Sequence, residues 1–310
     1  MAHYIVAGVT GRVGAAAASE LLEHGERVTV IVRDEARGLD WTRRGAEVAL
    51  GSLIDRSFVS DVARNTDGFF TLLPENVAPD DFHGSRRRMA DAMAGALHDS
   101  GVPHVVMLSA IAAVLPDGNG PAKDLHYCEN RLRACGATLT ALRACYFQDN
   151  VASALTPARQ AGIYPNFLPS VDFGFPMIAT RDVGRLAASA LTSPPPKSEV
   201  IDLFGPTYSV RQVAEHLGAA LGKTLEIVNI PPEGHVTALT QAGVPRQIAE
   251  AVAEMFAAFA AGLLVPHGDR SLNGSTTIDL VIADCLRHHQ AAELTALTQK
   301  HAGGSRNVLC

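Results

Sequence analysis

The stretch Gly8-Val9-Thr10-Gly11-Arg12-Val13-Gly14 decides the fold, because it joins a short apolar run to an alanine-rich helical pattern. In such a loop Gly8 permits a tight turn, Gly11 lets the backbone approach a pyrophosphate, and Gly14 lets the helix pack closely on a sheet. Amide groups at the start of the helix would then meet the pyrophosphate oxygens. The pattern also occurs as an ordinary glycine turn, but a strand before it and a helix after it favour dinucleotide binding.

The first half of the chain alternates short apolar runs with helical patterns, which is typical of parallel βαβ units. The expected strands are Tyr4–Ala7, Arg27–Val32, Ala46–Leu50, Gly68–Leu72, His104–Leu108 and Thr138–Leu142. The expected helices are Val13–Glu23, Glu35–Arg44, Arg56–Arg64, Asp80–Asp99 and Lys123–Cys135. The strand runs are continuously apolar, as in strands that helices cover on both faces. The sequence therefore predicts an α/β fold with a Rossmann doubly wound parallel sheet.

The pattern changes after residue 150. We expect residues 1–150 to form an NAD(P)-binding Rossmann domain and residues 151–310 to form a smaller mixed α/β C-terminal lobe that binds substrate. The expected elements of this lobe are helices at Ser209–Leu221, Pro245–Ala261 and Gln290–His301 and a strand at Leu225–Ile230. The pattern leaves open that some strands of this part return to the main sheet. Such a lobe usually closes a cleft over the carboxyl ends of the sheet strands.

Composition and charge argue against several classes of protein. The net charge is −6, and Lys and Arg are scattered apart from Arg86-Arg87-Arg88, which argues against direct nucleic-acid binding. No apolar run reaches about 18 residues and no signal peptide opens the chain, so we expect a cytoplasmic protein with no membrane span. The five cysteines lack C-x-x-C spacing and are expected as reduced thiols. The spacing of His and Cys also predicts no metal site.

The end of the second expected strand bears on the choice between NADP(H) and NAD(H). NAD-selective domains usually carry an acidic residue there, whose carboxylate accepts a hydrogen bond from the ribose 2′-hydroxyl. Here the strand ends at Val32-Arg33 and Arg37 follows one helical turn later, so two cations could bind a 2′-phosphate. Asp34 leaves the opposite preference open, and Arg33 could instead be a solvated surface residue. We expect NADP(H), with NAD(H) as the alternative.

An ordered set of short motifs follows the glycine loop. It consists of Val32-Arg33-Asp34, Gly51-Ser52-Leu53-Ile54-Asp55, Val106-Met107-Leu108-Ser109-Ala110, Glu129, Leu139-Thr140-Ala141-Leu142-Arg143, Phe147 with Asn150, Asp182-Val183-Gly184 and Gly205-Pro206-Thr207-Tyr208-Ser209. Together with the loop, this set resembles the NmrA-like branch of the atypical short-chain dehydrogenase/reductases, over about residues 3–265. The branch includes NADPH-binding quinone reductases and redox-sensing regulators.

The resemblance implies a set of cofactor-binding residues. The residues implied at the pyrophosphate are Gly8, Thr10, Gly11, Arg12, Val13 and Gly14. Arg33 would reach the 2′-phosphate, and Leu73, Pro74 and Ser109 would approach the nicotinamide half. Ser52 stands where the family often has Asp beside the adenine, so the resemblance leaves that contact open.

A second departure concerns proton transfer. If Glu129 is aligned with the glutamate that follows the Tyr-x-x-x-Lys pair of many short-chain dehydrogenases, the two positions of that pair hold Pro121 and Leu125. The usual proton relay is therefore missing. Reduction of a carbonyl by hydride still requires a proton for the developing alkoxide.

Tyr127 and His126 are the candidate catalytic residues, since they follow the loop after the fifth expected strand. Tyr127 and Arg131 would share one face of a helix, so the cation could lower the pKa of the phenol. Alternatively, both candidates are packing or surface residues. A quinone would relax the requirement, because its reduced oxygen is a weaker base than an alkoxide and can take a proton from water.

Aromatic residues concentrate after the sixth expected strand. Tyr146, Phe147, Phe173 and Phe175 are candidate substrate-binding residues, because aromatic walls suit flat apolar ligands. The alternative is that they form the core between the two parts of the chain.

Two functions fit these observations. The first is an NADPH-dependent oxidoreductase that transfers hydride to a quinone or another small aromatic or conjugated carbonyl. The second is a non-catalytic NADP(H)-sensing regulator that acts through a protein partner. The fold cannot choose between them. The sequence also leaves a homodimer open.

Overall fold

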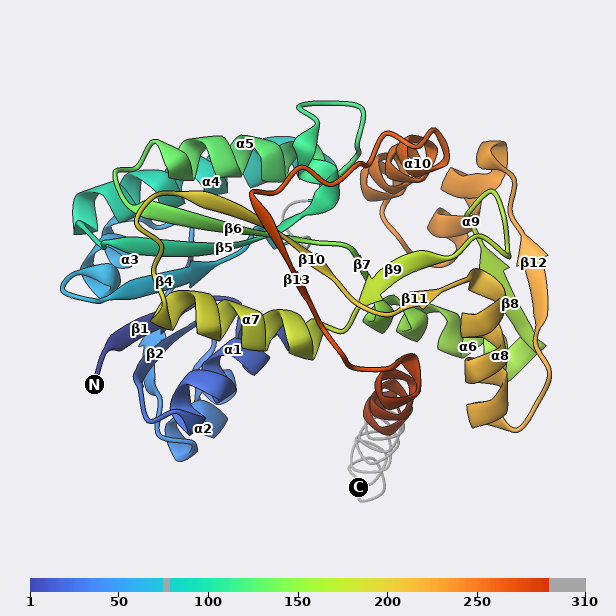
Figure 1. Cartoon of the computed structure of the whole chain (residues 1–310), viewed down its shortest axis with the longest axis horizontal. Helices are drawn as coiled ribbons and strands as arrows, with labels where there is room; N and C mark the ends of the chain where they lie inside the picture. The colour runs from blue at the N-terminus through green and yellow to red at the C-terminus, as the bar shows by residue number, and fades with distance from the viewer. Residues whose placement is uncertain (75–78, 290–310) are drawn as a thin grey trace, which may run out of the picture.

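An eight-stranded parallel sheet forms the centre of the computed structural model, which describes residues 1–74 and 79–289 (Figure 1). The strand order is β13-β10-β6-β5-β4-β1-β2-β3, and all neighbouring pairs are parallel. This order contains the 3-2-1-4-5-6 arrangement of a Rossmann sheet. The predicted fold class is confirmed.

All six strands expected in the first half of the chain are present in this sheet. Their bounds are β1 (His3–Val6), β2 (Arg27–Val32), β3 (Glu47–Leu50), β4 (Gly68–Thr71), β5 (His104–Ala110) and β6 (Thr138–Ala144). Two later strands, β10 (Glu199–Phe204) and β13 (Arg270–Asn273), join the sheet beside β6. The chain after residue 150 therefore returns to the main sheet, the option that the sequence left open.

Helices cover both faces of the sheet, and each face has its own core. On one face lie α1 (Arg12–Glu23), α2 (Glu35–Arg43) and α7 (Thr180–Thr192), and on the other α3 (Arg56–Ala63), α4 (Phe82–Ser100) and α5 (Ala122–Arg133) (Figure 1). Successive β1 residues alternate between the two cores, with Tyr4 and Val6 in one and Ile5 in the other. The first helix, α1, packs on α7, which the sequence analysis did not predict.

A smaller lobe lies beyond the carboxyl ends of β5 and β6 and has a third core (Figure 1). Its strands are β7 (Tyr146–Phe147), β8 (Ile163–Asn166), β9 (Phe175–Ile178), β11 (Thr207–Tyr208) and β12 (Glu226–Asn229). Its α-helices are α6 (Leu155–Ala161), α8 (Val210–Leu221), α9 (His235–Gln241) and α10 (Arg246–Ala260), and residues 278–289 are also helical. The predicted helices at 209–221 and 245–261 and the strand at 225–230 are confirmed. The predicted helix at 290–301 lies outside the described residues.

Short 3₁₀ helices connect several of these elements. They are η1 (Pro79–Asp81), η2 (Ile111–Val114), η3 (Gln148–Ala154) and η4 (Pro232–Gly234). Helix α10 docks on the main domain beside two of the connecting segments. Gln247 donates to the Asp80 carbonyl at 2.8 Å and accepts from the Phe82 amide at 3.2 Å. Gly120 lies so close to α10 that an added Cβ would come within 2.0 Å of the Ala251 carbonyl oxygen.

The close approach of α1 to the first strand predicts a stability defect. An added Cβ on Gly14 would lie 2.5 Å from the Gly8 carbonyl oxygen. Gly14→Ala should therefore lower the free energy of unfolding by about 1–3 kcal/mol, because the added methyl group would clash with backbone atoms that cannot move without distorting the turn. The matched control is Gly11→Ala, whose Cβ would meet the same oxygen at an ordinary 3.4 Å. Urea unfolding of both variants tests this, and equal stability of Gly14→Ala and wild type would contradict it.

Candidate functional site

The glycine loop leaves the start of α1 open. Gly8 has a left-handed φ of 72°, and its carbonyl accepts the Gly11 amide at 2.9 Å. No side chain caps α1 and its first turn has no acidic residue, whereas Asp34 caps α2 and Asp55 caps α3, all within the described residues. Uncapped first-turn amides are the groups that bind an anion at a helix N-terminus.

A groove of about 620 Å³ runs along the carboxyl ends of β1, β2 and β4. It brings together Gly8, Thr10, Gly11, Arg33, Arg37 and Pro74 from the expected cofactor set, with Asp34, Ser52 and Leu72. The groove starts at the open helix terminus and extends to the end of β2. Its walls are therefore suited to an extended, negatively charged ligand.

Two exposed arginines distinguish the β2 end of this groove. Within residues 1–74 and 79–289, neither Arg33 nor Arg37 forms an ion pair or side-chain hydrogen bond, although both line the groove. The neighbouring Asp34 carboxylate accepts the Ala36 amide at 2.9 Å and so is used in capping α2. The groove thus offers two unpaired cations where the sequence analysis expected a 2′-phosphate.

The remaining residues of the glycine loop have other contacts. Arg12 donates to Asp149 at 2.9 Å, and the same carboxylate accepts both the amide and the hydroxyl of Thr180. The Arg12 side chain thus ties α1 to the start of α7 through Asp149, and Arg12 is not among the residues that line the groove. Val13 and Gly14 are buried against the sheet.

Ser109 belongs to a buried polar network at the ends of β5 and β6. Its hydroxyl donates to Glu129 at 2.6 Å. Arg143, opposite Ser109 in the sheet register, donates to both Glu129 oxygens at 2.9 and 2.7 Å. The Ser109 hydroxyl is therefore bonded to Glu129, at a point on the sheet edge between the groove and the lobe.

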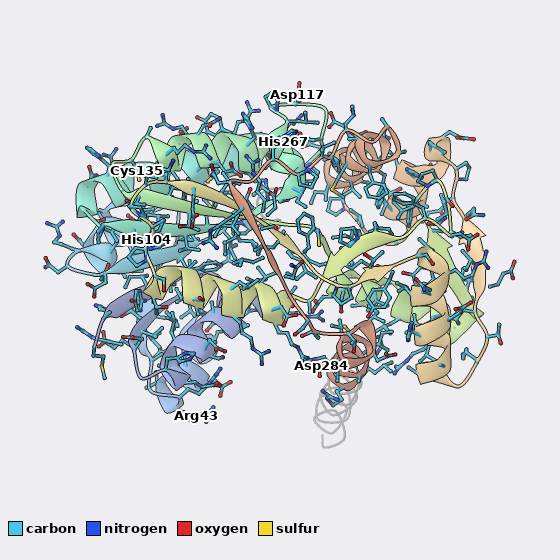
Figure 2. The ribbon with its side chains drawn as sticks, viewed as in Figure 1. Arg43, His104, Asp117, Cys135, His267 and Asp284 are labelled. Atoms are coloured by element: carbon cyan, nitrogen blue, oxygen red, sulfur yellow. The ribbon has the colours of Figure 1, made fainter. Side chains whose placement is uncertain are left out.

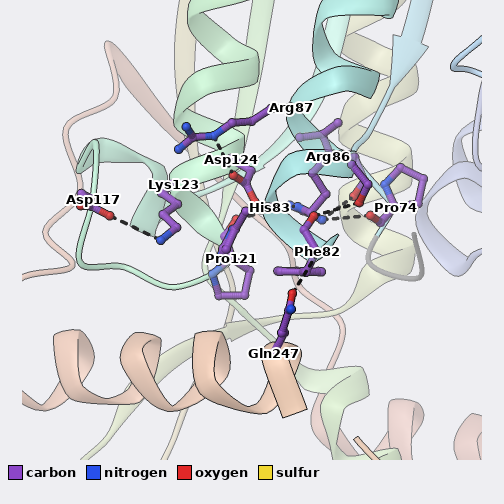
Figure 3. Close-up of polar contacts among 12 residues, drawn as sticks. Pro74, Phe82, His83, Arg86, Arg87, Asp117, Pro121, Lys123, Asp124 and Gln247 are labelled. Atoms are coloured by element: carbon purple, nitrogen blue, oxygen red, sulfur yellow. Dashed lines mark hydrogen bonds and ion pairs between the residues drawn. The ribbon is translucent and has the colours of Figure 1, made fainter. Parts of the chain in front are cut away.

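A second buried network fixes the backbone after β4 (Figure 3). Arg86, only 2% exposed, donates to the carbonyls of Leu73 at 3.4 Å, Pro74 at 3.0 Å and Pro121 at 3.3 Å. Asp124, with 0% of its side chain exposed, accepts Arg86 at 3.2 Å. His83 and Arg87 also contact the Asp124 carboxylate, at 2.7 and 3.4 Å.

Sequence reasoning missed the role of this network. Its visible sign was the run Arg86-Arg87-Arg88, which the sequence analysis noted only as a cluster of charge. In the structure all three arginines are paired with a carboxylate of α5 or of the segment before α4. The run therefore fixes the helix pair and the loop at the end of the groove.

Tyr127 has a different environment from the one that the sequence analysis expected. Its hydroxyl donates to Asp91 at 2.9 Å, and Arg131 contacts the same oxygen at 2.7 Å. Arg131 acts to lower the pKa of Tyr127 as expected, but the hydrogen bond to Asp91 has the larger effect and raises it overall. The carboxylate outweighs the cation because the phenol proton is bonded to it. Tyr127 lines neither the groove nor the apolar cavity at the lobe, whose described lining residues are given below.

The imidazole of His126 supports a wall of the site. Its Nδ1 donates to the Ala113 carbonyl at 2.8 Å, within η2. Ile111 and Ala112 of η2 line the cavity described next. The geometry gives His126 a structural role, and its catalytic role stays a prediction.

An apolar cavity of about 390 Å³ lies between the ends of β5 and β6 and the lobe. Three of the four candidate substrate-binding residues line it, Tyr146, Phe173 and Phe175, together with Phe204, Phe256 and Phe259, which the sequence analysis did not single out. The Phe175 ring meets those of Tyr146 and Phe259 edge-on, each at 5.5 Å between centroids. Figure 2 shows side chains from the main sheet and the lobe gathered in this region.

Phe147 points away from this cavity. It follows Tyr146 on β7, and successive strand residues point to opposite faces. Phe147 packs instead against the core beneath α1 and α7, while Tyr146 packs against the lobe core. A substrate role of Phe147 therefore has no support from the cavity lining.

The described ranges, 1–74 and 79–289, also bear on metal sites, membrane-spanning helices and thiols. No group of His, Cys, Asp and Glu side chains there could hold a metal ion. No helix there has the length and apolar character to cross a membrane. Cys128, Cys135, Cys145 and Cys285 are free thiols, and Cys310 lies outside the described residues.

Comparisons with known proteins agree with this architecture. Residues 3–284 match the model of the NmrA-like family. An NAD(P)H azoreductase of Xenophilus azovorans is 26% identical over 254 residues, which cover 82% of this chain and 86% of that protein.

Solved structures give a similar result. The Citrobacter sp. triphenylmethane reductase complexed with NADP(H) superposes with a TM-score of 0.76 at 18% identity, covering 91% of this chain and 99% of its own. An NADPH-dependent quinone oxidoreductase from Escherichia coli, complexed with NADPH, gives 0.72 at 17% identity, covering 92% and 99%. At these identities the likeness is one of fold.

The buried Arg86–Asp124 pair predicts a large stability effect. Asp124→Leu should lower the free energy of unfolding by about 3–5 kcal/mol, because it removes one partner of a buried, hydrogen-bonded ion pair. Asp91→Ala is the matched control, since Asp91 also pairs with an arginine across α4 and α5 but is 45% exposed. Asp91→Ala should lower the free energy of unfolding by at most about 1 kcal/mol. Urea unfolding compares the two, and similar losses would contradict the assignment.

Proposed function

Because the chain belongs to the NmrA-like family, we propose that it is an NADP(H)-dependent reductase that transfers hydride from NADPH to a quinone or another conjugated aromatic acceptor. The observation that carries the proposal is the arrangement of groove and cavity along one sheet edge. The groove follows β2, β1 and β4, and the cavity follows β5 and β6, which come next in strand order. Open α/β sheets bind ligands at this edge.

The groove supports NADP(H) as the cofactor. The uncapped start of α1 offers amides to the pyrophosphate, and the unpaired Arg33 and Arg37 offer charge-assisted hydrogen bonds to a 2′-phosphate. Relatives described above also support this choice, namely an NAD(P)H azoreductase and two reductases solved with NADP(H) or NADPH. In this proposal residues 1–150 bind most of the nucleotide and the later lobe binds substrate.

The chain's own residues then have distinct roles. Bound dihydronicotinamide supplies the hydride, which leaves NADP⁺ and adds two electrons to the acceptor. Leu73, Pro74 and the Ser109–Glu129 pair lie on the sheet edge between groove and cavity, where they orient the nicotinamide half. The aromatic walls hold a flat acceptor in place for hydride transfer. For a quinone the reduced oxygen takes its proton from water, so the missing Tyr-x-x-x-Lys pair is no obstacle.

Cofactor preference gives a selective test. Arg33→Ala and Arg37→Ala should each weaken NADPH binding by about 1.5–3 kcal/mol, the strength of a hydrogen bond to a charged group, and leave NADH binding unchanged. Arg43→Ala is the control, because Arg43 lies on the same helix but pairs with Asp40 outside the groove. Titration calorimetry with both nucleotides measures the effect. Equal losses for NADPH and NADH would remove the 2′-phosphate assignment.

Turnover is tested by following NADPH absorbance with purified protein and a panel of quinones, azo compounds and conjugated carbonyls. We expect oxidation of NADPH with at least one flat quinone or azo acceptor, because the cavity accommodates such a ring beside the nicotinamide end. Replacing Phe259 by Ala should raise KM for that acceptor, since Phe259 forms a ring contact with the cavity wall. Tight NADPH binding with no turnover on the whole panel would favour the cofactor-sensing regulator instead.

A further inference from the structure

The walls of the lobe cavity carry no charge. None of its lining residues is Asp, Glu, Lys, Arg or His, and the only side-chain polar groups among them are the Tyr146 hydroxyl and the Cys145 thiol. Burial raises the pKa of Cys145 to about 12, so this thiol stays protonated at neutral pH. A ligand inside the cavity therefore meets no ionised side chain.

The cavity is also apolar, and contacts between α10 and the main domain hold its shape. Met255, Phe256 and Phe259 of α10 form one wall. Helix α10 is anchored to the main domain through Gln247 and the close contact of Gly120. An ionised group brought into such a site loses its hydration without gaining a partner, which costs several kcal/mol in proteins.

Tyr146 supplies the one hydroxyl in these walls. Burial raises its pKa, and a side-chain hydrogen bond with Asn150 acts in the opposite direction. Tyr146 lines the cavity, and its phenol carries one O–H group that can donate a hydrogen bond to a ligand.

We propose that the cavity selects uncharged, flat aromatic acceptors, and that Tyr146 donates a hydrogen bond to the acceptor atom of the ligand, such as a quinone oxygen or an azo nitrogen. The hydroxyl is the sole side-chain donor with an oxygen among the lining residues, so it fixes which end of the ligand enters. Ionised substituents would have to stay outside, near the 57% exposed Phe173 at the mouth. This inference rests on the proposed function only in taking the bound ligand to be the hydride acceptor.

The charge rule is tested with two azobenzenes of matched size, the neutral 4,4′-disulfonamide and the ionised 4,4′-disulfonate. Because both rings carry the substituent, neither can enter without bringing it along. We expect the disulfonate to bind at least about 100-fold more weakly in equilibrium dialysis with the NADPH-loaded protein. Equal affinity of the two compounds, or equal affinity of a bis-ammonium analogue, would overturn the charge rule.

The role of Tyr146 is tested with trans-azobenzene and trans-stilbene, which share a shape but differ in whether they carry acceptor nitrogens. Wild type should bind azobenzene about threefold to tenfold more tightly, the range expected for one neutral hydrogen bond. Tyr146→Phe should abolish this difference and leave stilbene affinity unchanged, which also shows that the variant is folded. Tyr208→Phe is the control, because Tyr208 lies in the same lobe but its hydroxyl accepts the Ile278 amide outside the cavity.

The outcomes separate this inference from the proposed function. A persistent azobenzene preference in Tyr146→Phe would refute the hydrogen bond whether or not the protein turns over. If the binding pattern holds but NADPH is not oxidised by any acceptor, the proposed reductase function fails and the cavity assignment stands. If neutral and ionised acceptors are reduced with equal kcat/KM, the reductase function stands and this inference fails.

Discussion

The contact between α1 and the turn after β1 sets the position of the amides that the groove offers to a diphosphate. Gly14 lies so close to the Gly8 carbonyl that no side chain fits between them, and this closeness brings the helix start to the carboxyl edge of the sheet. The uncapped amides of α1 then lie beside the ends of β2 and β4. If α1 lay further from the turn after β1, its amides would no longer share a site for a diphosphate with the ends of β2 and β4.

Two buried carboxylates hold the part of the edge that connects groove and cavity. Glu129 joins Ser109 and Arg143 across β5 and β6, while Asp124 holds Arg86 against the carbonyls after β4. Each carboxylate comes from α5, so one helix positions both segments. A buried ion pair adds little net stability to a protein, but removal of one partner is strongly destabilising. These two carboxylates therefore act mainly to fix the geometry of the edge. The carbonyls of Leu73 and Pro74 and the Ser109 hydroxyl are thereby held in place beside the proposed nicotinamide position.

Much of this architecture was predictable from the sequence, and the failures have identifiable causes. The first six strands are continuous apolar runs, so their pattern was clear. Strand β10 is interrupted by Asp202, whose carboxylate accepts the Gly268 amide at 2.6 Å, and β13 is a polar edge strand with no apolar pattern. The groove residues of the glycine loop were predictable because they follow one another in the sequence. Asp124 was not, because its three partners come from a helix 37 to 41 residues away.

The cavity shows why the substrate side is harder to read than the cofactor side. Adjacent aromatic residues looked equivalent in the sequence, yet the pleat of β7 sends Tyr146 to the lobe core and Phe147 to the opposite core. The cavity is then completed by α10, more than 100 positions along the chain, whose place depends on how Gln247 and Ala251 dock on the main domain. The glycine loop of the groove is thus contiguous in the sequence, whereas the lining of the proposed acceptor cavity depends on the register of a two-residue strand and on the docking of a distant helix.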